Sequence, residues 1–124
     1  VSELVKEKNC LIKEAEKEIL GITHEEVGKL LAEKWRIPES IQDVILFHDN
    51  GIKTNASNNN LLISIVHLSN ILSHILELGY SGYDIIPKPN TLIWDILKIK
   101  KGTLTELKEK FINDYTSTVK LIML

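Results

Sequence analysis

Apolar residues recur along this chain at intervals of three and four, which is the spacing of an amphipathic helix. This pattern predicts a first helix over residues 2–19, ended by Gly21. A second helix is expected to begin near His24, because Thr23 and Glu26 have the spacing of a capping box. The apolar stripe of the second helix consists of Val27, Leu30, Leu31 and Trp35.

Further helical segments follow. Pro38 is favoured in a first turn, so a third helix should start there and run to His48. The remaining helices are expected over residues 60–78, over 92–97 and from Thr103 onward. In the last of them, Thr103 and Glu106 have the spacing of a second capping box. Residues 80–90 are expected to form a loop. No stretch alternates with period two for long enough to indicate a strand. The predicted fold is all-α, a compact bundle of about five to six helices.

Length and composition limit the kind of protein. The chain has 124 residues, 44% hydrophobic and 26% charged, which is typical of one globular domain spanning residues 1–124. The apolar run over 61–78 contains seven polar residues, so we expect no membrane partner. A single cysteine, Cys10, excludes an internal disulfide and fits a reducing cytoplasm. The chain begins with Val1, and we expect it to be a piece of a longer protein.

The charge balance argues against a nucleic-acid partner. The net charge is −2, so no overall positive field attracts polyanions. The only dense basic patch consists of Lys98, Lys100 and Lys101.

The predicted hairpin of the second and third helices gives a candidate metal site. Helices joined by a short turn pack antiparallel, so His24 and His48 should meet at one end, with Asp49 beside them. Two imidazoles and a carboxylate form an incomplete set of transition-metal ligands. The alternative is structural: His24 is a local polar group of a first turn, and His48 is stabilised by the dipole at a helix C-terminus.

A polar stripe on the helix over 60–78 is the second candidate feature. His67, Asn70 and His74 are spaced i, i+3 and i+7, which aligns them on one side. The expected apolar face lies opposite and consists of Leu61, Ile65, Leu68, Leu72, Ile75 and Leu76. The polar stripe is either a solvated face or a docking face for another part of the parent protein or for a protein partner.

Other chemical signals are weak. The sequence has no GxSxG, P-loop or GxGxxG motif. Cys10 is interpreted as a small helix residue, and the pair Glu25 and Glu26 as solvated charges. Trp35 and Trp94 are expected to pack in the core or at its edge, because no basic stripe accompanies them.

These residues resemble an HDOD domain, the HD-related output domain of bacterial signalling proteins. The resemblance is specific over 16–48, moderate to residue 79 and weak beyond. It is carried by Glu16, by Leu20-Gly21-Ile22-Thr23-His24 with Val27-Gly28, by Leu30-Leu31, Trp35 and Pro38, by Ile45 with Phe47-His48, and by Ile65-Val66-His67-Leu68-Ser69-Asn70. It implies a helical bundle, a bacterial cytoplasmic signalling context and a distant relation to HD and HD-GYP phosphohydrolases.

Three departures from the family bear on activity. His48-Asp49 stands where the family has a His-His pair, and Asn70 stands where active HD-type hydrolases use an aspartate. The resemblance also implies an upstream metal-binding His…His-Asp motif, and this chain starts after it. The chain has no GYP motif either.

The resemblance therefore implies a non-catalytic signal-transduction or interaction module with degraded metal-ligand positions, for which no cofactor is expected. Its partners would be other domains of a parent signalling protein or a separate protein. The alternative is an HD-type metal-dependent phosphohydrolase acting on phosphoesters or cyclic dinucleotides. In that case iron, manganese or zinc would bind His24, His48 and Asp49, completed by upstream residues.

Overall fold

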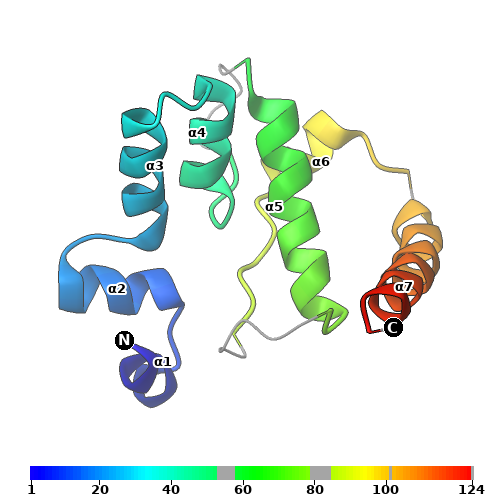
Figure 1. Cartoon of the computed structure of the whole chain (residues 1–124), viewed down its shortest axis with the longest axis horizontal. Coiled ribbons are helices and arrows are strands. Elements are labelled where there is room, and N and C mark those ends of the chain that lie inside the picture. Colours follow the sequence, from blue (N-terminus) through cyan, green and yellow to red (C-terminus); the bar gives the residue numbers. More distant parts are fainter. Residues whose placement is uncertain (53–57, 79–84, 101, 124) are drawn as a thin grey trace.

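The computed structural model describes residues 1–52, 58–78, 85–100 and 102–123. Within these ranges the chain forms seven α-helices and no strand, so the all-α prediction is confirmed (Figure 1). The helices are α1 Ser2–Lys8, α2 Ile12–Leu20, α3 His24–Lys34, α4 Glu39–Phe47, α5 Asn60–Ile75, α6 Leu92–Leu97 and α7 Thr103–Ile122.

The predicted first helix is in fact two helices, α1 and α2. Asn9 ends α1 in a left-handed conformation with φ 49°, which asparagine tolerates better than most residues. Leu11 is extended and begins α2, where its backbone N–H donates to the Glu14 carboxylate over 2.9 Å. Cys10 lies in this break, so its interpretation as a helix residue is wrong. The apolar spacing continues across the break and therefore does not reveal it.

The α3–α4 hairpin forms as predicted. The capping box is present: the Glu26 N–H donates to Thr23 Oγ1 over 3.3 Å, and the Thr23 N–H donates to the Glu26 carboxylate over 2.9 Å. Pro38 occupies the N-cap of α4. A Cβ on Gly28 would lie 2.7 Å from Ile45 Cγ2, so glycine allows the two helices to pack closely side by side (Figure 1).

The core lies where α5 packs against α4 and α6. Its most buried side chains include Ile52, Ile63, Ile71 and Ile93. The predicted orientation of α5 is wrong. Leu61 and Ile75 of the expected apolar face are each 56% exposed, whereas His67 of the expected polar stripe is fully buried. Helical periodicity identifies the two faces of a helix, but here the buried one holds His67, whose ring finds two hydrogen-bond partners.

The ends of two helices also differ from the prediction. Helix α5 ends at Ile75, and Glu77 follows with φ 52°. Helix α7 begins after Gly102, which has φ 95°, and Thr103 is its first residue, so the second capping box does not form. Residues 85–90 of the expected loop have no regular structure, and residues 79–84 lie outside the described ranges.

The apolar stripe of α3 lies at the surface. Trp35 is 68% exposed, and its expected place in the core is wrong. Val27, Leu30 and Leu31 are also exposed, at 40%, 58% and 43%. We call these four residues the α3 apolar stripe. No helix among the described residues is long and apolar enough to cross a membrane.

Candidate metal centre

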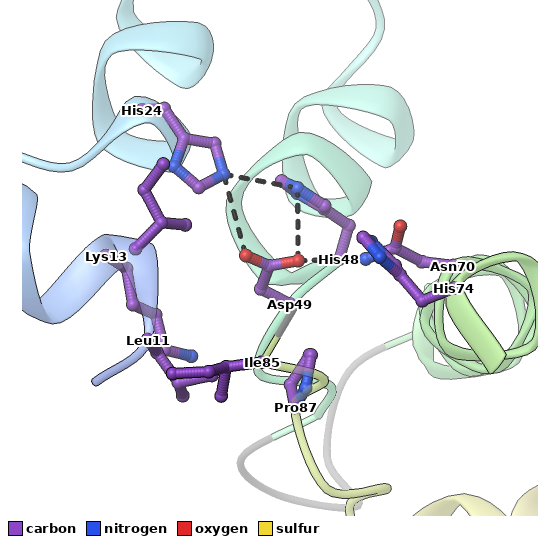
Figure 2. A pocket seen from close by; sticks show the side chains of 10 residues that line it. Leu11, Lys13, His24, His48, Asp49, Asn70, His74, Ile85 and Pro87 are labelled. Atoms are coloured by element: carbon purple, nitrogen blue, oxygen red, sulfur yellow. Dashed lines mark hydrogen bonds and ion pairs between the residues drawn. The ribbon is translucent and has the colours of Figure 1, made fainter. Parts of the chain in front are cut away.

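The three predicted ligands converge at one end of the α3–α4 hairpin (Figure 2). His24 is the first residue of α3, His48 follows the last residue of α4, and Asp49 comes next. The Nε2 atoms of His24 and His48 are 3.4 Å apart. Asp49 Oδ2 lies 3.6 Å from His24 Nε2, and Asp49 Oδ1 lies 3.5 Å from His48 Nε2. The structure therefore brings together the residues that the sequence singled out.

The other ring nitrogen of each histidine is held by an oxygen. His24 Nδ1 lies 2.7 Å from Glu16 Oε2, and His48 Nδ1 lies 2.8 Å from the Ile45 carbonyl oxygen. A carboxylate and a carbonyl only accept, so both Nδ1 atoms carry the hydrogen and donate it. In the neutral rings each Nε2 then presents a lone pair toward the other and toward Asp49. A positive charge between the two Nε2 atoms and the Asp49 carboxylate, either a proton on one ring or a metal ion, would relieve the repulsion between these lone pairs.

The spacing of these atoms fits a small divalent ion. In a tetrahedral site with metal–ligand bonds of about 2.0–2.1 Å, neighbouring ligand atoms lie about 3.3–3.4 Å apart. The 3.4 Å between the two imidazole Nε2 atoms matches that value. Asp49 faces them with one oxygen toward each ring, Oδ2 at 3.6 Å from His24 and Oδ1 at 3.5 Å from His48, and one ligand atom from each of the three residues lies within 4.8 Å of the others. Three protein ligands also leave the fourth tetrahedral position open, as in sites where a metal binds an exchangeable ligand.

Glu16 supports this arrangement from α2. Its Oε2 accepts both from His24 Nδ1 and from the His24 backbone N–H, the latter over 3.0 Å. A carboxylate behind a ligating histidine fixes the ring and its tautomer. Glu16 is almost buried, at 9% exposure. Sequence spacing does not reveal this role of Glu16, because only the turn between α2 and α3 brings Glu16 and His24 together.

In the polar stripe of α5, His67 is fully buried and so does not take part in a docking face, whereas Asn70 and His74 are partly exposed. His67 Nδ1 lies 2.7 Å from the His48 carbonyl oxygen, and the Asn90 N–H donates to His67 Nε2 over 3.2 Å. Asn70 Nδ2 donates to Asp49 Oδ1 over 2.9 Å and thus orients that carboxylate. His74 lines the cavity beside it.

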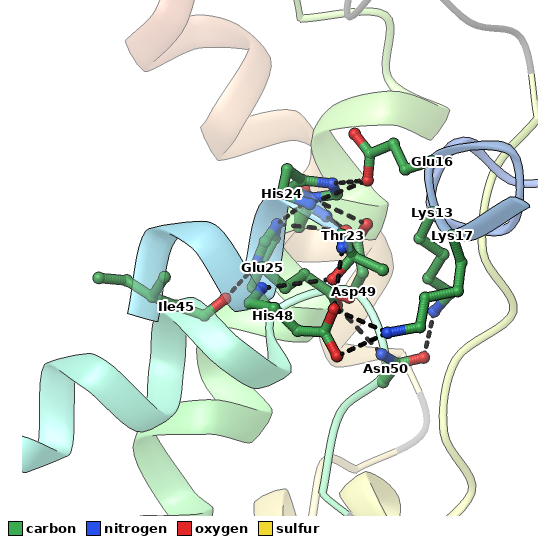
Figure 3. A network of polar contacts seen from close by, with 12 residues as sticks. Lys13, Glu16, Lys17, Thr23, His24, Glu25, Ile45, His48, Asp49 and Asn50 are labelled. Carbon is green, nitrogen blue, oxygen red and sulfur yellow. Dashed lines mark hydrogen bonds and ion pairs between the residues drawn. The ribbon is translucent and has the colours of Figure 1, made fainter. Parts of the chain in front are cut away.

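A second buried carboxylate lies behind the hairpin (Figure 3). Glu25 is only 4% exposed, and Asn50 Nδ2 donates to its Oε1 over 3.0 Å. Burial raises the pKa of Glu25, an effect that Lys13 opposes and Asp49 reinforces. Lys13 Nζ in turn donates to Asn50 Oδ1. The interpretation of Glu25 as a solvated charge is therefore wrong.

Glu26, by contrast, is a surface group. The Thr23 backbone N–H and then Lys17 lower the pKa of Glu26. Its role is to cap α3, which places His24 in the first turn.

Fold and site together define an all-α domain with a His/His/Asp cluster that has the geometry of a metal centre. The model of the HDOD domain family matches residues 1–51, which contain α1–α4 and all three candidate ligands. The HDOD resemblance is thereby confirmed over residues 1–51. Comparison with curated proteins and with solved structures found no match.

Proposed function

We propose that this HDOD-type chain is a non-catalytic interaction module of bacterial cytoplasmic signal transduction, and that it holds one divalent cation at His24, His48 and Asp49. The HDOD match over residues 1–51 supports the signalling context. The cation is a step beyond the sequence-based interpretation, which expected no cofactor.

One observation carries the cation. Two imidazoles whose Nδ1 hydrogens are already donated face each other with their Nε2 atoms 3.4 Å apart. Two lone pairs at this distance repel unless a positive centre lies between them. A metal ion bound by both Nε2 atoms and by Asp49 supplies this positive centre.

The surroundings of the centre argue for binding without hydrolysis. Among the described residues, the cluster of His24, His48 and Asp49 offers one carboxylate, and it is the only such cluster. The Asn70 side-chain amide donates to Asp49 and orients that carboxylate, and it adds no second negative charge to the centre. A two-metal centre that activates water needs more negative ligands than this.

The α3 apolar stripe supports the interaction part of the proposal. Four large apolar side chains at helical spacing are exposed on one element, with Trp35 the most exposed of them. Contiguous exposed apolar surface is typical of a protein–protein contact, and tryptophan often dominates the affinity of such contacts.

The test is metal content together with activity. The purified chain would be loaded separately with zinc, iron(II) and manganese, gel-filtered and measured by elemental analysis. The same samples would be assayed for hydrolysis of bis(p-nitrophenyl) phosphate. We expect one metal ion per chain, and we expect its loss in His24→Ala and His48→Ala. His74→Ala is the matched control, since His74 lines the same cavity but lies outside the ligand cluster.

Each outcome bears on a different part of the proposal. Absence of metal from the wild-type chain after loading would refute the cation. Bound metal with turnover of the phosphodiester would refute the non-catalytic function and favour the phosphohydrolase. Metal retained in both histidine variants would show that the ligands have been wrongly assigned.

A further inference from the structure

The cavity beside the candidate metal centre has two chemically different halves (Figure 2). Its volume is about 180 Å³. One side carries the three ligands together with Asn70 and His74. The other side has the apolar residues Leu11, Ile85 and Pro87, toward which the Lys13 side chain extends, and Ile12 also lines the cavity. A ligand that fills this space must therefore combine a polar head with an apolar tail.

We propose that the cavity binds a small aliphatic carboxylate, whose head group takes the open position on the cation and whose tail lies against the apolar half. This inference rests on the proposed cation at His24, His48 and Asp49. It names the ligand class to which the signalling module would respond.

The charge at the head-group end favours an anion. A divalent ion with two neutral imidazoles and one carboxylate keeps one net positive charge and one open tetrahedral position. Lys13 adds a second positive charge on the cavity wall. Its Nζ donates to Asn50, the residue after Asp49, so Lys13 is expected to act on a ligand through its charge.

Two acidic groups near the centre have to be included in this balance. The Glu16 carboxylate is engaged by the ring and the backbone N–H of His24. Glu25 is only 4% exposed, and its carboxylate is engaged by Asn50 Nδ2 over 3.0 Å. Neither side chain lines the cavity, so among the described residues the charges that a ligand meets directly are those of the cation, Asp49 and Lys13.

The size and lining of the cavity restrict the tail. A water molecule occupies about 30 Å³ of the liquid, so the cavity has room for about six water-sized groups. Bonded atoms lie closer together than separate water molecules, so butyrate, with six non-hydrogen atoms, fits inside the cavity and covers more of its apolar wall than acetate does. Inorganic phosphate would satisfy the polar half but would leave Ile85 and Pro87 facing water.

The experiment uses the whole chain loaded with cobalt(II), because the visible spectrum of tetrahedral cobalt changes when its fourth ligand is exchanged. The probes are acetate, propionate, butyrate, octanoate and inorganic phosphate at constant ionic strength. We expect affinity to rise about fourfold per methylene from acetate to butyrate, about 15-fold in total. Octanoate should gain little more, because its tail extends beyond the cavity.

Three variants separate the two halves of the site. Ile85→Ala should weaken butyrate binding by several-fold and leave acetate binding unchanged. Lys13→Gln should weaken all the carboxylates by the same factor. Lys34→Gln is the matched control, because Lys34 is exposed on α3 and lies outside the cavity lining.

The outcomes distinguish this inference from the proposed function. Stoichiometric cobalt with equal affinity for acetate and butyrate would overturn the carboxylate site and leave the metal centre intact. Tighter binding of phosphate than of butyrate would do the same. Carboxylate binding that persists in metal-free His24→Ala, followed by calorimetry, would show that the cation is not the anchor. A wild-type chain that takes up no cobalt or zinc would overturn both the metal centre and this inference.

Discussion

The His67 imidazole makes two buried hydrogen bonds that can be removed one at a time. Its Nδ1 donates to the His48 carbonyl oxygen over 2.7 Å, and its Nε2 accepts from the Asn90 N–H over 3.2 Å. The amide nitrogen of asparagine can stand where Nδ1 stands, and the amide oxygen of glutamine can reach the place of Nε2. His67→Asn therefore keeps the bond to His48, His67→Gln keeps the bond to Asn90, and His67→Leu loses both.

The expected losses of stability follow from full burial of His67. A buried donor or acceptor left without a partner costs about 1–3 kcal/mol. Each amide variant should lose about that much free energy of unfolding, and His67→Leu about 2–6 kcal/mol. For a domain of this size, 1 kcal/mol corresponds to about 4 °C in Tm, so each amide variant should melt about 4–12 °C lower. Calorimetry of the metal-free protein in EDTA measures this without a contribution from bound ions.

Zinc affinity supplies the second readout, since the bond to His48 fixes the backbone that carries two candidate ligands. Loss of a group that orients metal ligands typically lowers affinity about 10–100-fold. His67→Gln should show this loss, whereas His67→Asn should bind zinc nearly as well as the wild type. Unchanged Tm values in both variants would refute the two bonds. Equal destabilisation with unchanged zinc affinity would show that His67 supports the fold but does not position the centre.

Three further predictions concern other parts of the chain. Trp35→Ala should change the free energy of unfolding by less than about 0.5 kcal/mol in urea titration, whereas Ile93→Ala, in the core, should cost about 2–5 kcal/mol. Gly51→Ala should destabilise more than Gly21→Ala by about 1–3 kcal/mol: both have positive φ, but only at Gly51 would a Cβ meet other residues, the nearest atom at 2.9 Å. Burial raises the pKa of Glu25, so the stability contributed by its neutral form is fully present below pH 4.5 and declines as pH rises through the raised value. Glu25→Gln should therefore raise Tm at pH 7 but not at pH 4. A gain in Tm that is the same at both pH values would contradict this cause.

The hairpin of α3 and α4 could be predicted because its signals are local. Thr23 and Glu26 cap one helix, and Pro38 starts the next. A short turn then requires antiparallel packing, and this alone brings His24 and His48 to the same end. His24 and His48 thus converge because α3 and α4 begin and end at positions that residues close in the sequence determine.

The features that could not be predicted depend on partners distant in the sequence. His67 is buried because the backbone of His48 and of Asn90 satisfies its ring, and neither contact leaves a trace in the spacing of α5. The exposure of Trp35 has the converse cause. Periodicity finds the apolar stripe of α3, but it does not show whether another element covers that stripe.

The candidate centre also extends beyond the segment that the family model matches. All three ligands lie within residues 1–51, yet the groups that orient two of them, His67 and Asn70, come from α5. Asn90 ties this support to the rest of the chain, because its Nδ2 donates to the carbonyl oxygen of Ile52 over 2.8 Å and its Oδ1 accepts from the N–H of Leu92 over 3.0 Å. Binding at His48 and Asp49 would therefore act directly on the contacts between α4, α5 and the start of α6.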